Sequence, residues 1–254
     1  EAPGGAPSGP ARAAGLAGRA DEVRLTLLLF LLSFFGLGLP RIYTSTAAHT
    51  IFIDTYGPEF IPYAYIAQAI FIPLFGHLFM KADARLPLRS LVIGSMALDI
   101  LVLLGMWSGF TFTDLGPMAW VGMIWFEVEF ILCSLWLWGT ATQLLDLRQG
   151  KRLFGYISAG EPLAIILGGL ATPLALRFIA TRDLLLFSAA GVFVAICVVL
   201  YITTRYSLQR DAAEQFAEET PERPAARPWY AERYVQVLVG IVVISQFGYY
   251  FTDT

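Results

Sequence analysis

The stretch Leu184–Thr204 reads LLLFSAAGVFVAICVVLYITT, 21 residues without one charged side chain. A helix of this length rises about 30 Å, which matches the hydrocarbon thickness of a lipid bilayer. A strand is excluded, because in lipid it would leave backbone N–H and C=O groups without hydrogen-bond partners. The stretch therefore predicts a transmembrane helix.

Apolar runs of this kind recur along the chain. Its 254 residues are 57% hydrophobic and 15% charged, with a mean hydropathy of +0.63, whereas soluble domains are about 25% charged. This predicts an all-α membrane protein. The expected spans are Arg24–Ile53, Ile61–Met80, Ser90–Trp107, Pro117–Gln143, Leu153–Phe178, Leu184–Thr204 and Tyr234–Thr254.

The basic residues predict how these spans are oriented. The odd-numbered connections hold only Arg177 and Arg182, and Arg41 lies inside a span. Cytoplasmic loops carry the excess of Lys and Arg, so the N-terminus of this multi-pass protein is predicted to be cytoplasmic, in the cell (inner) membrane. The other fourteen of the 17 basic residues lie before the first span or in even-numbered connections: Arg12, Arg19, Arg24, Lys81, Arg85, Arg89, Arg148, Lys151, Arg152, Arg205, Arg210, Arg223, Arg227 and Arg233.

Four parts are predicted along the chain. Residues 1–22 are rich in Ala, Gly and Pro and lack an apolar signal core, so we expect a disordered N-terminal tail. Residues 23–205 form a six-helix transmembrane bundle, residues 206–233 a charged cytoplasmic linker, and residues 234–254 a seventh helix. Because the chain ends within or just past an apolar helix, we expect the native polypeptide to continue.

The first span contains a predicted kink followed by a charge. The sequence Gly36–Pro40 favours a kink, because Pro40 removes one backbone hydrogen bond and the glycines permit bending. Arg41 follows, about 25 Å along the helix axis from Arg24. An Arg inside the bilayer costs ~3 kcal/mol on insertion scales, so it needs a partner or a wet cavity. The alternative is that its long side chain reaches the outer surface.

Polar residues on the same helix face extend this feature. Thr44, Ser45 and His49 follow Arg41 by three, four and eight residues and are predicted to share its face. This side of the first span is therefore predicted to line a polar chamber.

Acidic residues in other spans are the candidates for the counter-charge. Glu127 lies about ten residues into the fourth span, with Ser134 on the same helix face, while Glu129 points elsewhere. Glu127 pairs with Arg41 in the first interpretation and is a protonated, hydrogen-bonded carboxyl in the second. Glu161 is either a structural cap or a ligand contact, and Asp99 is expected to pair with a neighbouring helix.

Asp253 is a further candidate. It lies 20 residues beyond Arg233, much as Arg41 lies 17 residues beyond Arg24. If the protein is built from two six-helix repeats, the first and seventh helices face each other across a central cavity. Arg41 and Asp253 are then predicted to form a cross-cavity pair or to flank a bound anion.

Other features bear on packing and chemistry. Cys133 and Cys197 lie in apolar runs and predict no disulfide. Enzyme, metal and phosphate-loop motifs such as HExxH, CxxC and GxSxG are missing, so we expect no enzyme, no cofactor, no metal and no nucleic-acid partner. Small residues of the fifth span are predicted to allow close helix approach: Gly155, Ser158, Ala159, Gly160, Ala164, Gly168 and Gly169.

Several short motifs resemble those of one family. The chain is similar to the bacterial and plastid ATP/ADP carrier-like (nucleotide transporter) family of the major facilitator superfamily. The resemblance covers about residues 40–254. The motifs that carry it are Pro40-Arg41, Tyr56–Tyr63 (YGPEFIPY), Trp138–Gln143 (WGTATQ), Arg148–Gly155 (RQGKRLFG), Gly168-Gly169 and Phe251–Asp253 (FTD).

This resemblance implies a twelve-helix transporter working by alternating access, with the first, fourth and seventh helices lining the cavity. The family's nucleotide exchangers carry a Lys in the second helix, whereas here that place lies near Tyr65 and the span Ile61–Phe79 has no basic residue. A nucleotide is therefore one candidate within a wider class of solutes. The candidate solute-binding residues are Arg41, Glu127, Asp253, Ser45, His49, Tyr65, Gln68, Ser134 and Glu161.

Two functions from different classes follow from the sequence. The first is a secondary transporter of the facilitator type, with antiport as one mode, that moves an anionic or zwitterionic small solute with Arg41 as the anion contact. The second is a non-transporting membrane module, an anchor, sensor or accessory subunit that is fused to or associated with a cytoplasmic domain or a larger membrane complex. Both have the lipid bilayer as their surroundings.

Overall fold

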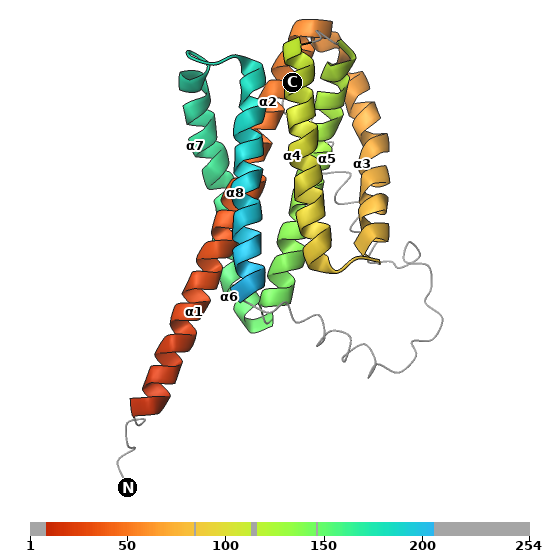
Figure 1. Cartoon of the computed structure of the whole chain (residues 1–254). Helices are drawn as coiled ribbons and strands as arrows, with labels where there is room; N and C mark the ends of the chain where they lie inside the picture. The colour runs from red at the N-terminus through yellow and green to blue at the C-terminus, as the bar shows by residue number, and fades with distance from the viewer. Residues whose placement is uncertain (1–8, 84, 113–115, 146, 206–254) are drawn as a thin grey trace. The chain divides into compact units, whose positions relative to one another are not determined.

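The computed structural model describes residues 9–205 apart from residues 84, 113–115 and 146; the side chains of residues 9–20, 88, 147–149 and 151 are also outside the description. The predicted linker, the seventh helix and Asp253 lie outside this part of the chain. Every element within it is helical (Figure 1). The elements are α1 (Gly9–Ser33), η1 (Phe34–Gly38), α2 (Leu39–Tyr56), η2 (Pro58–Phe60), α3 (Ile61–Asp83), α4 (Leu88–Phe112), α5 (Gly116–Leu144), α6 (Leu147–Ser158), α7 (Gly160–Ala175), η3 (Thr181–Asp183) and α8 (Leu184–Arg205).

Six helical stretches of the described chain are long and apolar enough to cross a membrane, which makes this a multi-pass membrane protein. They correspond one to one with the first six predicted spans. Their ends differ by a few residues, because helices continue into the polar flanks where hydropathy no longer marks them. The six stretches are Asp21–Tyr56, Pro58–Asp83, Arg89–Phe112, Gly116–Leu144, Arg152–Ala175 and Thr181–Arg205.

The helix that leads into the first span begins earlier than predicted. α1 starts at Gly9, so it includes residues 9–22, which the sequence analysis placed in a disordered tail. Pro10 lies in its first turn, where a missing N–H has no cost, and Ala-rich sequence of high helix propensity follows.

The predicted kink in the first span is a change of helix type. Residues Phe34–Gly38 form the π-helical turn η1, in which the N–H of Leu39 donates to the carbonyl oxygen of Phe34. Pro40 is the second residue of α2, where it cannot donate a backbone hydrogen bond. Such π-helical turns inside a helix are frequent at functional sites.

The fifth span is also interrupted, which the sequence analysis did not predict. It was expected to run as Leu153–Phe178, but α6 ends at Ser158 and α7 begins at Gly160. Pro162 lies in the first turn of α7 and has no N–H to continue the hydrogen-bond ladder of α6.

The two interruptions pack against each other. η1 contacts α7 and α8 as well as its own neighbours α1 and α2. A Cβ added to Gly160 would come 2.6 Å from the carbonyl oxygen of Phe30, and one added to Gly38 would come 2.6 Å from that of Glu161. The predicted close approach of the fifth span is therefore confirmed at Gly160, whereas a Cβ at Gly155 or Gly169 would meet no atom within 4 Å.

α2 lies at the centre of the bundle's contacts. It packs against α5, α8 and α7, while α4 packs against α8 and α5, and α3 lies along α5 (Figure 1). The apolar core runs between these helices and includes Leu29, Met96, Trp136 and Val192, each at most 1% exposed. This arrangement brings the predicted polar residues of α2 and α5 to one helix interface.

Candidate functional site

The site begins with an ion pair between α2 and α5. Arg41 Nη2 donates to Glu127 Oε1 at 3.2 Å, and Arg41 Nη1 lies 3.1 Å from Glu127 Oε2. The planar guanidinium thus faces both carboxylate oxygens, the arrangement that Arg adopts with carboxylates and phosphates. The predicted pairing of Arg41 with Glu127 is confirmed, and the alternative in which Arg41 extends away to the membrane surface is not adopted.

The pair is deep in its spans but not sealed. Arg41 lies near the middle of the span Asp21–Tyr56, and Glu127 near the middle of Gly116–Leu144. Their side chains nevertheless remain 28% and 23% exposed. A charged pair at this depth is costly when it faces lipid, so what lies against its open side decides its role.

Aromatic rings of α5 enclose the guanidinium. The carbon at its centre lies 4.3 Å from the ring centroid of Phe130 and 5.3 Å from that of Phe126. Phe126 directly precedes Glu127, and Phe130 follows it by about one turn of helix. Cation–π attraction helps to hold the guanidinium in place, where Nη2 donates to the carboxylate and the buried Nη1 makes no hydrogen bond among the described residues.

The polar face of α2 divides between two neighbours. His49 packs its ring edge-to-face on Phe126 with centroids 4.9 Å apart, so it lies beside the ion pair as predicted. Its Nδ1 and the Ser45 hydroxyl bond to carbonyl oxygens of α2 itself, those of Ser45 and Ile42. The prediction for Thr44 is wrong: this side chain is fully buried and meets Ser188 of α8. Three residues turn a helix by about 300°, and the remaining offset of about 60° turns Thr44 into the bundle interior, where Ser188 of α8 and Glu129 of α5 lie.

Other predicted solute contacts lie elsewhere. Gln68 of α3 is 5% exposed and donates its amide N–H to the carbonyl oxygen of Met123, so it joins α3 to α5. Tyr65, 37% exposed, lies on the same helix. Ser134 is half-buried on α5, two turns beyond Glu127. Their predicted role as solute contacts stays a prediction, and Asp253 lies outside the described residues.

Glu161 lies on α7, another helix that packs against α2. It stands at the start of α7, is half-buried, and is close enough for the charge of Arg41 to act on it. Its backbone packs on Gly38, three residues before Arg41. The interrupted fifth span thus brings a second carboxylate towards the guanidinium.

A second polar cluster lies deeper in the bundle and was not assembled by the sequence analysis. Asp99 of α4 accepts a hydrogen bond from Trp125 Nε1 at 2.9 Å, so the expected pairing of Asp99 with a neighbouring helix is confirmed. Glu129 accepts one from Ser188 Oγ at 3.3 Å. Asp99 and Glu129 are 4% and 2% exposed, on helices that pack together, and the charge of each acts on the other. The sequence did offer a sign of this cluster: Asp99 and Glu129 lie in the middle of predicted spans, where a charged side chain costs as much free energy as it does at Glu127.

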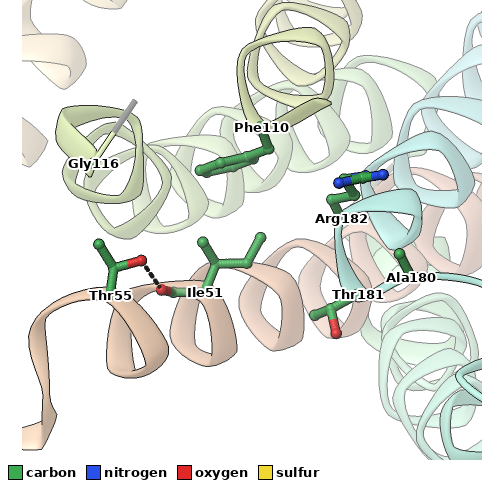
Figure 2. A pocket seen from close by; sticks show the side chains of 7 residues that line it. All are labelled: Ile51, Thr55, Phe110, Gly116, Ala180, Thr181 and Arg182. Carbon is green, nitrogen blue, oxygen red and sulfur yellow. Dashed lines mark hydrogen bonds between the residues drawn. The ribbon is translucent and has the colours of Figure 1, made fainter. Parts of the chain in front are cut away.

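A cavity of about 420 Å³ opens at the end of the bundle where α2 and α4 finish and α5 begins (Figure 2). The Thr55 hydroxyl at its wall donates to the carbonyl oxygen of Ile51 in the same helix. Neither Arg41 nor Glu127 lines this cavity. Its walls are Ile51, Thr55, Phe110, Gly116, Ala180, Thr181 and Arg182.

Among the described residues no three His, Cys, Asp or Glu side chains are grouped to hold a metal ion. The two cysteines are free thiols, Cys133 buried and Cys197 exposed. Comparison of the chain with protein-family models, curated proteins and solved structures finds no match in any of the three.

Proposed function

We propose that the chain belongs to a secondary transporter of the major facilitator type, which moves an anionic or zwitterionic small solute by alternating access, as carriers of the ATP/ADP type do. In this proposal the described helices form the N-terminal six-helix half-bundle, a seventh helix follows, and the N-terminus is cytoplasmic. The distribution of Lys and Arg supports that orientation.

The observation that carries the proposal is the half-open ion pair of Arg41 and Glu127. Its guanidinium presents the planar fork of donors that binds carboxylates and phosphates in two-point contact. A solute anion that reaches the open side competes with Glu127 for these donors. Glu161 and His49 lie close to the place where this competition occurs. Glu127 thereby holds Arg41 in place between transport cycles and keeps its charge neutralised.

The two helix interruptions supply places for motion next to this pair. η1 ends three residues before Arg41, and the break between α6 and α7 is two residues before Glu161. Breaks in the hydrogen-bond ladder absorb changes of backbone angle at low cost, as hinges require. Both breaks meet at one contact, so bending there moves Arg41 and Glu161 relative to each other.

A specific observation also favours the second candidate, a non-transporting membrane module that anchors or senses for an associated domain or complex. Glu127 neutralises the charge of Arg41 within the bundle, so in a module that binds no solute Arg41 requires no other counter-charge. The two proposals differ in what the open side of the pair meets, which is a solute in the first and protein or lipid in the second.

The experiment that separates them is uptake by liposomes containing the full native protein, screened with labelled anionic and zwitterionic solutes. Native protein and Arg41→Ala are measured side by side, with Arg182→Ala as a matched control that removes an exposed arginine at the bundle end. The transporter proposal expects uptake by the native protein and the control, and at least tenfold less by Arg41→Ala. Equal uptake by all three removes Arg41 from the mechanism, and no uptake of any solute favours the module.

A further inference from the structure

The carboxyl groups of Asp99 and Glu129 form a buried pair that the proposed solute contact does not use. Asp99 lies near the middle of α4 and Glu129 near the middle of α5, both within membrane-spanning stretches. α4 packs against α5, the charge of each carboxylate acts on the other, and each residue is at most 4% exposed. Water therefore does not solvate these charges from outside the bundle.

Each carboxyl group has one oxygen that receives a hydrogen bond and one that does not. Trp125 Nε1 donates to Asp99 Oδ1, and Ser188 Oγ donates to Glu129 Oε1. Asp99 Oδ2 and Glu129 Oε2 are buried and have no hydrogen-bond partner among the described residues. Two buried acceptors left without donors cost free energy that one added donor removes.

Among the described residues around Asp99 and Glu129, Arg41 is the one positively charged group that acts on this pair of carboxyl groups. From α2 the pair is faced by Thr44 and, farther away, by Arg41, whose guanidinium is engaged with Glu127. From α8 it is faced by Ser188, and within α5 by the Cys133 thiol. On the α3 side, Gln68 bonds to the α5 backbone and Phe75 packs edge-to-face on Trp125. Two ionised carboxylates here would repel each other in a medium of low dielectric constant.

We propose that Asp99 and Glu129 form a proton-binding site, in which one proton held between the two carboxyl groups neutralises one charge and supplies the missing donor. The proton comes from water and binds a lone pair of one free oxygen, so that a carboxylate becomes a carboxyl group and the site gains one positive charge. The Ser188 hydroxyl, 2.8 Å from Thr44 Oγ1, extends the hydrogen-bond chain from this site to α2, three residues from Arg41. This inference does not depend on solute transport.

Infrared spectroscopy of the full protein in lipid nanodiscs tests the proposal, because the C=O stretch of a protonated carboxyl group is separate from that of a carboxylate. We expect such a band at neutral pH. It shifts when side-chain carboxyl groups of Asp or Glu carry ¹³C, is lost in Asp99→Asn/Glu129→Gln, and persists in the matched variant Glu127→Gln. Absence of the band from the native protein, or its survival in the double variant, overturns the proposal.

Two further variants assign the band without replacing either acid. They keep the proposal testable if the Asp99→Asn/Glu129→Gln protein does not fold. Trp125→Phe removes the hydrogen bond to Asp99, and Ser188→Ala removes the one to Glu129. We expect at least one of them to shift the carboxyl band, whereas Ser95→Ala, whose hydroxyl bonds only to its own helix at Val92, leaves it in place. A band that neither Trp125→Phe nor Ser188→Ala moves belongs to another residue, and the proposal is then wrong.

Discussion

The guanidinium of Arg41 and the carboxylate of Glu127 meet through two contacts of 3.1 and 3.2 Å between the middles of two membrane-spanning helices. Arg41 is costly to place in a bilayer, and the fold meets that cost with an acid on α5 and the ring of Phe130. Because the pair keeps about a quarter of its surface open, it is the feature from which the functional proposal follows.

Removal of one partner is predicted to destabilise the bundle more than removal of both. Glu127→Gln leaves an unpaired guanidinium in a half-buried position, which we expect to lower stability by about 1–3 kcal/mol. Arg41→Gln/Glu127→Gln recovers part of that loss, because no unpaired charge remains. A double-mutant cycle from unfolding in detergent micelles measures the coupling.

The matched control for this cycle is the other ion pair of the described chain, Glu22 with Arg152, where the Arg152 side chain is 63% exposed. Arg152→Gln is expected to change stability by less than about 1 kcal/mol, as for surface pairs. Additive effects of the Arg41 and Glu127 substitutions would show that the contact between them contributes nothing to stability.

The contact between the two helix interruptions requires glycine at Gly160 as well as at Gly38. Gly160→Ala places a Cβ 2.6 Å from the Phe30 carbonyl oxygen and 3.0 Å from the Phe34 backbone nitrogen, neither of which moves without shifting a helix. We expect a loss of about 1–3 kcal/mol, as for overpacked cores. Thermal unfolding of the purified protein measures it.

Gly169→Ala, in the same helix, is the control. Nothing lies within 4 Å of its added Cβ, so stability is expected to stay the same or to rise slightly, because Ala is the better helix former. If Gly160→Ala were as stable as Gly169→Ala, the close approach of α7 to α1 and η1 would be wrong.

The buried Asp99 depends on its tryptophan donor. Trp125→Phe keeps an aromatic ring but removes the hydrogen bond to Asp99, and we expect a cost of about 1–3 kcal/mol. Trp107→Phe is matched to it, since Trp107 donates to Asp183 over the same 2.9 Å. Asp183 is only part-buried and also accepts the Ala180 N–H, so the second substitution costs less. Unfolding curves in which the order is reversed contradict the assignment of Asp99 as a deep residue.

The proposed orientation predicts which loops reach each side of the membrane. In a variant without Cys133 and Cys197, single cysteines are placed by Arg85→Cys, between α3 and α4, and by Arg182→Cys, before α8. A membrane-impermeant maleimide applied to intact cells is expected to label Arg182→Cys, and to label Arg85→Cys only after the membrane is opened. The opposite pattern places the N-terminus outside.

The positions of the described spans follow from the sequence alone, because the bilayer imposes length and apolarity on each run, as at Leu184–Thr204. The Gly36–Pro40 interruption was also predicted, since Pro40 lacks an N–H. Its π-helical form was not, because that depends on how α7 and α8 pack around Phe34–Gly38. The break before Gly160 was missed for another reason: apolar residues continue on both sides of it, so hydropathy gave no sign that Pro162 ends the hydrogen-bond ladder of α6.

The ion pair was predicted from the cost of a buried charge, which leaves few candidates for the partner of Arg41. The proximity of Asp99 to Glu129 was not predicted, because two acids on different helices can be recognised as a cluster only when those helices are known to pack together. Thr44 shows the same limit, since an offset of about 60° on α2 decides between the half-open ion pair and the buried interior of the bundle. Face assignments within a bundle need the neighbouring helices, which the periodicity of one span does not contain.

The account depends most on what lies against the open side of Arg41. Reaction of the native protein in its membrane with phenylglyoxal, an arginine-selective reagent that acts from water, followed by peptide mass spectrometry, tests this directly. Arg182 is exposed at the bundle end and is the internal positive control. The account predicts that Arg41 is modified as well and that a transported anion protects it. Full modification of Arg182 with none at Arg41 would mean that the pair faces lipid or protein, and Arg41 would then have no role as an anion contact.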